Sequence, residues 1–351
     1  MTISDPMAAA HLYRLAFGFI PAQMIHAAAR LRLPDLLADR PLTTEGLADL
    51  TGTHAPSLRR LLRGLASLGL VEEDEDGLFR LTPAGAPLRS DVPGSVRPML
   101  MPYFDEAVWA SWGRFLDSVR TGRPSVETVT GGSVFDHFAS DPELSAEFHA
   151  AMAVSGSAES WALARSYDFD GVKTVVDVGG GSGALLAGIL SHHPALRGIL
   201  VDTPEGVSGA PTALAAAGVE DRCEVRAQDF FASVPGGGDL YVIKSVLHDW
   251  DDEACVRILR NCRRSMDDAA RLLVVEVVAP AVVDTTTDPF LAVSDLNLMV
   301  LTRGRERTEE EFTRLLEASG LRLTGIGDPV GFNGYRTIEA RPAAAGSGGA
   351  R

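Results

Sequence analysis

A run of glycines near the middle of the chain constrains its fold more than any other feature. Residues 173–178 are mainly apolar and β-branched, Gly-Gly-Gly-Ser-Gly follows at 179–183, and an apolar segment occupies 184–190. This order predicts a strand, a tight turn and a helix. Glycine leaves space where a backbone must bend sharply and approach a ligand, and the start of a helix offers unpaired N–H groups. The run therefore predicts a site for a nucleotide-like cofactor.

The glycine run fits two kinds of cofactor. Gly179, Gly181 and Ala184 stand at the spacing Gly-x-Gly-x-x-Ala, which is typical of dinucleotide-binding turns. A similar turn binds S-adenosylmethionine (SAM). The run alone therefore leaves a nicotinamide enzyme and a SAM enzyme open.

Acidic residues stand at the ends of the strands that follow. Segment 198–202 is a second apolar strand ending in Asp202, and segment 222–231 is a third, ending in Asp229 and Phe230. The carboxylate of Asp202 could accept hydrogen bonds from the two hydroxyls of a ribose. The carboxylate of Asp229 could accept from the amino edge of an adenine, and the ring of Phe230 could stack on its face. Since the carboxyl ends of parallel strands converge on one crevice, we expect these residues around the glycine turn.

Further elements complete a predicted α/β fold with a doubly wound, Rossmann-like sheet. A fourth strand covers 239–244 and leads into Ser-Val-Leu-His-Asp-Trp, and a fifth covers 272–276 with Glu276 at its tip. Thr308 and Glu311 form a predicted capping box. The remaining predicted elements are helices over 254–264 and 308–319 and strands over 321–326 and 336–340.

The first 95 residues predict a small winged-helix unit. Short helices over 44–52 and 56–69 precede a hairpin over 70–81. Such a unit either binds DNA or serves as a structural or dimerisation module. Segment 1–95 has nine arginines and no lysine against eleven acidic residues, and five successive acids fill the predicted wing at 72–76. This charge argues against binding to phosphates and favours the dimerisation module.

Composition narrows the partners and the location. The 351 residues carry a formal net charge of −15 and are 46% hydrophobic, so the chain can bury a large core and is long enough for two domains. The acidic balance disfavours nucleic acid and anionic membranes as partners. Three cysteines suit a reducing compartment, and no apolar run is long enough to span a membrane. We therefore expect a cytoplasmic protein.

Two clusters invite a metal site, and neither has a suitable arrangement. His192 and His193 are adjacent, so they point to different faces of a helix. The acids at 249–253 lie on one helix turn, where carboxylates make a poor octahedral cage. We expect no metal, and a divalent cation at 249–253 is the runner-up.

Aromatic residues are frequent in the mostly helical segment 98–167, which precedes the glycine run. Most are expected in the core, and some line a pocket for a flat apolar substrate. Met152 and Trp161 are preferred for this pocket because they lie nearest the glycine run in sequence. Further pocket candidates from segment 288–304 are Phe290, Asp295, Asn297 and Met299.

The ordered motifs resemble those of the SAM-dependent O-methyltransferases of the plant caffeic acid type and of bacterial enzymes that tailor aromatic polyketides and antibiotics. The resemblance covers almost the whole chain. It implies a winged-helix N-terminal domain used for homodimerisation, and a doubly wound domain that holds SAM. The motifs are Asp177-x-Gly-Gly-Gly-Ser-Gly183, Asp202, Asp229-Phe-Phe231, Lys244-x-x-x-His-Asp-Trp250, Glu276 and Gly304-Arg-Glu-Arg-Thr308.

The resemblance implies a role for each cofactor-binding motif. The glycines would lie against the methionine part of SAM, Asp202 on the ribose hydroxyls, and Asp229 with Phe230 on the adenine. Lys244 and Ser245 would approach SAM from the fourth strand. The residues implied in SAM binding are Asp177, Gly179, Gly180, Gly181, Gly183, Asp202, Asp229, Phe230, Lys244 and Ser245.

The resemblance also implies the chemistry. His248 matches the family's general base, Glu276 and Glu306 the acids that orient it, and Asp249 a residue that contacts substrate or supports the histidine. The implied reaction is in-line methyl transfer to a phenolic or enolic hydroxyl of an aromatic metabolite, leaving S-adenosylhomocysteine. A few relatives hydroxylate or decarboxylate instead. A nicotinamide dehydrogenase and a SAM-sensing DNA-binding regulator stay open as alternatives, although neither accounts for these residues together.

These observations predict four segments. They are a winged-helix-like dimerisation domain over 1–95, a helical linker and substrate-pocket region over 96–165, a SAM-binding domain over 166–342, and a disordered tail over 343–351.

Overall fold

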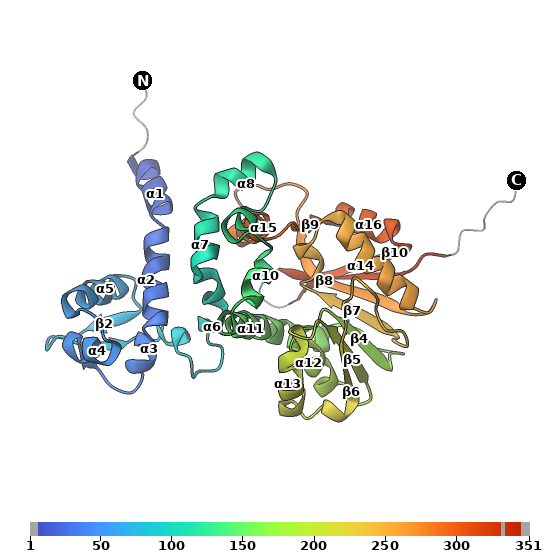
Figure 1. The fold of residues 1–351 in the computed structure, drawn as a ribbon, viewed down its shortest axis with the longest axis horizontal. Coiled ribbons are helices and arrows are strands. Elements are labelled where there is room, and N and C mark those ends of the chain that lie inside the picture. Colours follow the sequence, from blue (N-terminus) through green and yellow to red (C-terminus); the bar gives the residue numbers. More distant parts are fainter. Residues whose placement is uncertain (1–5, 331–333, 345–351) are drawn as a thin grey trace, which may run out of the picture. The chain divides into compact units, whose positions relative to one another are not determined.

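The computed structural model describes residues 6–330 and 334–344, without the side chains of 154–159. Its contacts divide the chain into two compact units, Met1–Phe104 and Asp105–Arg351, which Figure 1 shows with their elements labelled. From residue 345 onward, the predicted disordered tail lies outside the described residues.

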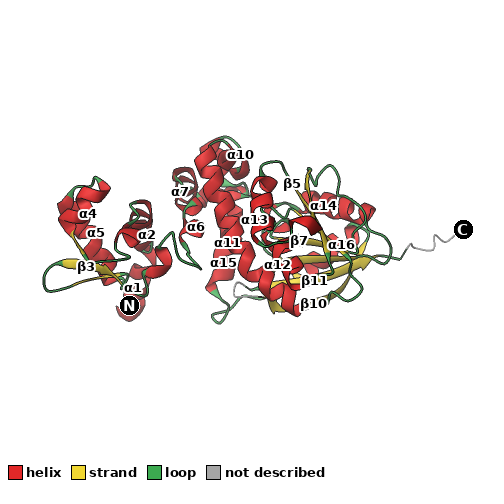
Figure 2. Ribbon diagram, turned by 90° about the horizontal axis from the view of Figure 1, so that it is seen from below, coloured by secondary structure: helices red, strands yellow, loops and turns green. Residues whose placement is uncertain are grey.

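The smaller unit combines helices with a short antiparallel sheet of order β1-β3-β2. Figure 2 shows β3 beside α4 and α5. The Thr43 side chain caps α4 by accepting a hydrogen bond from Gly46 N. Two helices followed by a hairpin match the predicted elements. The elements are α1 (Pro6–Ala16), α2 (Phe19–Arg30), α3 (Leu33–Leu36), β1 (Leu42–Thr43), α4 (Thr44–Thr51), α5 (Ala55–Ser67), β2 (Val71–Glu73), β3 (Leu78–Leu81), η1 (Ala86–Leu88), α6 (Arg97–Leu100) and η2 (Pro102–Phe104).

The first two helices of the smaller unit present an apolar surface. None of the side chains of α1 is buried by the described residues. Exposed apolar side chains gathered on neighbouring helices commonly mark an interaction site. The exposed apolar residues are Met7, Leu12, Tyr13, Leu15, Phe17, Phe19 and Ile20.

The larger unit is built on a mixed sheet of order β10-β11-β8-β7-β4-β5-β6, with β9 pairing with β8. The strands β4 to β8 are parallel to their neighbours in this group, and β10 and β11 are antiparallel. The predicted Rossmann-like α/β class is confirmed. The strands are β4 (Thr174–Val178), β5 (Arg197–Asp202), β6 (Cys223–Ala227), β7 (Leu240–Lys244), β8 (Arg271–Ala279), β9 (Arg307–Thr308), β10 (Leu321–Val330) and β11 (Tyr335–Pro342).

Helices cover both faces of this sheet. Apolar side chains of α12 and α13 pack on one face and those of α14 and α16 on the other, and Figure 1 shows these two pairs of helices on opposite sides of the sheet. None of the described helices has the length and apolar character needed to cross a membrane. The helices are α7 (Glu106–Trp112), α8 (Phe115–Thr121), α9 (Ser125–Thr130), α10 (Val134–Ala139), α11 (Pro142–Ser166), α12 (Ala184–His192), η3 (Gly206–Gly209), α13 (Ala210–Ala216), η4 (Glu220–Arg222), η5 (Leu247–Asp249), α14 (Asp252–Ser265), α15 (Pro289–Leu301) and α16 (Glu309–Ala318).

The strand order fixes where a ligand site forms. The chain runs from β4 through β5 to β6 on one side and then from β7 to β8 on the other. The order therefore reverses at β4, and a crevice forms outside its carboxyl end. The glycine turn follows β4 directly and so lies at this crevice.

Two predicted strand ends are wrong. The strand β6 ends at Ala227, so Asp229 and Phe230 lie in the loop that follows it. The strand β8 runs on to Ala279 because β11 and β9 pair along it, so Glu276 lies inside the strand and not at its tip. Glu276 is consequently a fully buried side chain in the sheet.

Candidate active site

The glycine turn between β4 and α12 has three residues in the left-handed region. The angle φ is +74° at Gly179, +54° at Gly181 and +77° at Gly183. A Cβ at Gly179 would lie 2.6 Å from Val246 Cγ2, whereas one at Gly181 would meet no described atom within 4 Å. The turn is therefore packed on one side and open at Gly181, where a ligand can approach the backbone.

Two acids lie beside this turn. Asp202 ends β5, and its Oδ2 accepts a hydrogen bond from Gly181 N at 2.8 Å. Asp177 is a buried residue inside β4, and its Oδ2 has no hydrogen-bond partner among the described residues. Burial, together with the charge of Asp202 and against the opposing charge of Lys244, raises the pKa of Asp177 to about 7. Burial also raises the pKa of Asp202.

These acids test whether the turn fits SAM. An open glycine backbone, a strand-end carboxylate and an unpartnered buried carboxylate suit a ligand that brings hydroxyl donors and positive charge. SAM has a ribose diol, an ammonium group and a sulfonium, so the residues fit it.

The loop after β6 brings an aromatic ring to the glycine turn. Phe230 is buried, and its Cε1 would lie 3.6 Å from a Cβ at Gly179. Asp229 is exposed, and its Oδ1 accepts a hydrogen bond from Phe231 N. Asn261 on α14 donates to the carbonyl oxygens of Phe230 and Phe231 at 2.8 and 2.9 Å. Asn261 was not predicted from the sequence, and it fixes this loop.

Lys244 and Ser245 form a small network at the end of β7. Ser245 has φ +53°, which is rare for a residue with a side chain. Its Oγ donates to Tyr335 Oη at 2.9 Å and lies 3.2 Å from Lys244 Nζ. The Lys244 ammonium also lies 4.7 Å from the centroid of the Tyr335 ring. Tyr335 enters the site from β11, and no motif in the sequence indicated it.

His248 lies in the short helix η5, which follows β7. Its Nδ1 is 3.3 Å from Glu276 Oε2 and 3.8 Å from Glu306 Oε1, and its Nε2 is 3.8 Å from Asp249 Oδ1. The side chain of His248 is 16% exposed. The structure therefore brings together the four residues predicted to be catalytic, although they come from three separate segments.

Glu276 holds the backbone that carries His248. Its Oε1 accepts hydrogen bonds from the amides of Val246 at 3.0 Å, Leu247 at 2.9 Å and His248 at 3.4 Å. Three amides on one carboxylate oxygen partly offset the cost of burying the charge. Glu276 is consequently a support for the loop as well as a neighbour of the imidazole.

Burial and charge act against each other in this cluster. Burial lowers the pKa of His248, but the charges of Glu276, Asp249 and Glu306 outweigh it and raise the pKa to about 10. Burial raises the pKa of Asp249 to about 6, and the charge of His248 opposes that rise. Burial likewise raises the pKa of Glu276. The carboxylates therefore stabilise a positive charge on the imidazole.

The segment that carries Glu306 is held by two residues of α15, of which only Asp295 was predicted from the sequence. Glu306 Oε1 accepts a hydrogen bond from Ser294 Oγ at 2.7 Å, and Glu306 N donates to Asp295 Oδ1 at 2.9 Å. Asp295 and Ser294 lie on α15. Asp295 was predicted to line the substrate pocket, and in this structure its carboxylate supports the Glu306 backbone.

The other predicted pocket residues are spread out. Trp161 is 54% exposed, and its ring packs on His192 at the far end of α12 from the glycine turn. Asn297 Oδ1 accepts a hydrogen bond from Trp112 Nε1 at 3.3 Å. Met152 and Phe290 are exposed and Met299 is partly buried.

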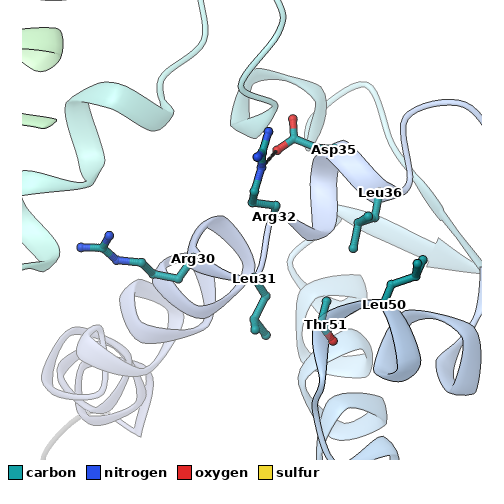
Figure 3. Close-up of a pocket in the computed structure, with 7 residues that line it drawn as sticks. All are labelled: Arg30, Leu31, Arg32, Asp35, Leu36, Leu50 and Thr51. Atoms are coloured by element: carbon teal, nitrogen blue, oxygen red, sulfur yellow. Dashed lines mark hydrogen bonds and ion pairs between the residues drawn. The ribbon is translucent and has the colours of Figure 1, made fainter. Parts of the chain in front are cut away.

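Two hollows lie on the described surface. One, of about 630 Å³, has Asp249, Trp250 and Phe231 in its wall together with Phe135 of α10, so it adjoins the His248 cluster. The other, of about 390 Å³, belongs to the smaller unit. Figure 3 shows its lining, including the ion pair between Arg32 and Asp35. Its lining residues are Arg30, Leu31, Arg32, Asp35, Leu36, Leu50 and Thr51.

Comparison with protein families shows which class of enzyme the chain belongs to. A model of the O-methyltransferase domain matches residues 112–322, and a model of the O-methyltransferase dimerisation domain matches residues 13–90. The chain belongs to the O-methyltransferase family. The predicted SAM-dependent enzyme class is thereby confirmed.

Individual relatives agree with this assignment. The methyltransferase is 44% identical over 333 residues to the O-demethylpuromycin-O-methyltransferase of Streptomyces alboniger, which covers 93% of this chain and 88% of the relative. It matches the structure of the mitomycin 7-O-methyltransferase MmcR with a TM-score of 0.90 and 38% identity, over 96% of this chain and 98% of that one.

A third relative was crystallised with its ligands. The O-methyltransferase NcsB1 from neocarzinostatin biosynthesis, solved with SAM and 2-hydroxy-5-methyl naphthoic acid, matches with a TM-score of 0.80 and 33% identity, over 92% of this chain and 96% of that one. SAM is confirmed as the cofactor of the methyltransferase. These matches give no support to the alternatives of a nicotinamide dehydrogenase or a SAM-sensing regulator.

The buried carboxyl of Asp177 predicts a pH-dependent stability. Its pKa in the folded chain, about 7, exceeds its ordinary value of 3.8, so its contribution is present below pH 4 and is lost as pH rises through 7. Between pH 5 and pH 8, wild type should therefore lose roughly 3 kcal/mol relative to Asp177→Asn. Urea unfolding of both proteins at the two pH values measures this.

Asp268 provides the control for this measurement, because its side chain is 97% exposed. Asp268→Asn should unfold with the pH dependence of wild type. An Asp177→Asn variant with the same pH dependence as wild type would contradict the assignment of a raised pKa to Asp177.

Proposed function

We propose that the methyltransferase transfers a methyl group from SAM to a phenolic or enolic hydroxyl of an aromatic secondary metabolite, with His248 as the general base. The observation that carries the proposal is the His248 cluster, in which one imidazole has three carboxylates within 4 Å. A base oriented by acids suits the removal of a proton from a weakly acidic hydroxyl.

The SAM site in this proposal is the crevice around the glycine turn. Bound SAM supplies an electrophilic methyl group. The open backbone at Gly181 and the carboxylate of Asp202 would hold the cofactor, and Asp177 would face its positive charge. The other residues proposed to hold SAM are Gly179, Gly180, Gly183, Asp229, Phe230, Lys244 and Ser245.

The geometry around His248 supports a choice between its two ring nitrogens. Nδ1 faces Glu276 and Glu306, whereas the Asp249 carboxylate lies 3.8 Å from Nε2, beyond hydrogen-bond distance, so Nε2 is the nitrogen that can accept from the substrate hydroxyl. As Nε2 takes the proton, the two carboxylates stabilise the imidazolium that forms. A positioned base contributes about 10²–10⁴-fold, and alignment of the two reactants contributes a further 7–11 kcal/mol or so.

The relatives support an aromatic substrate. NcsB1 was solved with a naphthoic acid, and the hollow beside Asp249 has Phe135, Phe231 and Trp250 in its wall. Flat aromatic ligands are commonly held by such side chains. Met152, Phe290, Asn297 and Met299 stay pocket predictions, as does segment 96–165 as the pocket region.

A homodimer completes the proposal. The match to a dimerisation domain over residues 13–90 and the exposed apolar side chains of α1 and α2 support it. An apolar helix surface of this kind becomes stable when a second copy covers it. The cytoplasmic location stays a prediction.

The substrate class predicts the outcome of an activity screen. The methyltransferase should transfer labelled methyl groups from SAM to phenolic or enolic natural-product precursors, because His248 is placed to remove a hydroxyl proton. Mass spectrometry of the products, compared with matched anilines and with precursors whose hydroxyl is already methylated, measures this. Label found on the anilines and on none of the phenols would contradict the hydroxyl assignment.

Removal of the proposed base predicts a large loss of turnover. His248→Ala should lower kcat by about 10²–10⁴-fold, since the proton then has no positioned acceptor. SAM binding, measured by calorimetry, should be retained because the glycine turn and Asp202 are unchanged. Turnover within about tenfold of wild type, with SAM binding intact, would show that His248 is not the base.

The charge around His248 predicts the pH profile. The base works in its neutral form, so kcat/KM rises with pH through the pKa of His248, which lies above its ordinary 6.5. Glu306→Gln removes one charge that raises this pKa, so the acid limb should move to lower pH by about one unit or more. Glu310→Gln, an exposed acid paired with Arg314, is the control. An acid limb that stays in place in Glu306→Gln would contradict the coupling.

A further inference from the structure

We infer that Arg307 positions His248 for proton transfer by clamping the backbone on either side of it. The inference rests on the proposed role of His248 as the base. Arg307 does not reach the substrate or the imidazole in this account, so it is a positioning residue.

The guanidinium of Arg307 bridges the two sides of η5. Its Nη1 donates to Leu247 O at 2.8 Å and its Nη2 donates to Trp250 O at 2.7 Å. These two carbonyls bracket His248 and Asp249 in the chain. A planar fork with several N–H donors can hold both carbonyls at once, which a single ammonium cannot do in the same geometry.

The peptide group between Leu247 and His248 is held from both ends. Its carbonyl accepts a hydrogen bond from Arg307, and its amide, that of His248, donates to Glu276 Oε1 at 3.4 Å. Fixing a peptide plane at both ends fixes the Cα of His248, from which the imidazole projects. The distances from Nδ1 to Glu276 and Glu306 depend on that Cα.

The orientation of Arg307 is itself fixed. Its side chain is 1% exposed, and Asp252 Oδ1 accepts from its Nε at 3.1 Å and from its Nη2 at 2.9 Å. Arg305 Nη2 also pairs with Asp252, through Oδ2 at 2.9 Å, and its side chain is about half exposed. Arg305 thus shares the ion pair with Asp252, and within the described part of the chain it donates to none of the carbonyls of η5, so it is a matched control.

A third contact restrains the same turn. A Cβ at Gly304 would collide with the carbonyl oxygen of His248. The segment 304–307 therefore meets η5 through the Gly304 backbone, the Glu306 carboxylate and the Arg307 guanidinium. A shift of this segment displaces the imidazole and one of its carboxylates together.

A double-mutant cycle tests this inference. In the full-length enzyme, Arg307→Lys keeps the charge facing Asp252 but loses the fork, so kcat should fall by about 10–10²-fold, the scale of a misplacement near 1 Å. The KM for SAM should stay within about twofold, and the acid limb of the pH profile should shift. Arg305→Lys should leave kcat, both KM values and the limb unchanged.

The His248→Ala background separates positioning from stability. If Arg307 acts through His248, adding Arg307→Lys to His248→Ala should lower the residual kcat by less than about twofold, because the effects of residues that act as a unit do not add. An equal loss in both backgrounds would overturn the inference. So would a lowered melting temperature with kcat and the acid limb unchanged. If His248→Ala alone left kcat unchanged, that result would instead contradict the proposed function.

A second variant covers the case in which Arg307→Lys fails to fold. Asp252→Asn frees the guanidinium from its ion pair while Arg307 and the carbonyls remain. It should lower kcat several-fold in the wild-type background, by roughly 3–10-fold, and have no effect on His248→Ala. Full turnover in Asp252→Asn, or the same loss in both backgrounds, would overturn the inference.

Discussion

A single buried carboxylate holds the site together. Glu276 lies inside β8, and one of its oxygens accepts hydrogen bonds from the amides of residues 246, 247 and 248. These hydrogen bonds fix the place where the chain turns after β7. They also hold the loop that carries His248 close to the glycine turn, against which Val246 packs. The cost of burying this carboxylate is offset by the three amides and by the imidazole.

The second oxygen of Glu276 faces the imidazole of His248 and stabilises positive charge on it. It lies 3.3 Å from Nδ1 of His248 and has no hydrogen bond to another described residue. The same side chain thus sets the backbone and polarises the ring. Because support and electrostatics come from one residue, replacing Glu276 would confound the two effects, whereas Glu306 and Arg307 let them be varied separately.

Part of the site could be predicted from the sequence because its residues stand at strand ends or at fixed spacings within motifs. The glycine turn and Asp202 follow from strand ends, and His248, Glu276 and Glu306 follow from a resemblance of ordered motifs. Arg307, Asn261 and Tyr335 could not be predicted in this way. Arg307 and Asn261 bind main-chain carbonyls, which every residue has, and Tyr335 meets Ser245 only through the pairing of distant strands.

Met152 and Trp161, chosen for the pocket by their closeness to the glycine run in sequence, stay predictions. Met152 and Trp161 both precede the glycine run, but they lie on one long helix, α11. Nine residues of α-helix separate two positions by about 14 Å, so the two side chains project from different points along α11. Trp161 lies against His192 accordingly. The position of a side chain along a helix axis decides what it contacts, and the frequency of apolar residues in a segment does not give that position.

The register of β8 has a consequence for how this enzyme can vary. Lys244 pairs with Val275, so Glu276 stands one step beyond the end of β7. Side chains alternate between the two faces of a sheet, and a slip of one residue would move Glu276 to the opposite face and leave a valine beneath the turn. Surface loops generally tolerate insertions, but an inserted or deleted residue within Leu272–Val275 would remove Glu276 from the amides that it holds and so detach His248 from its support. Changes that alter which substrate the enzyme accepts are therefore confined to the side chains and loops around the crevice, while the length of β8 stays fixed.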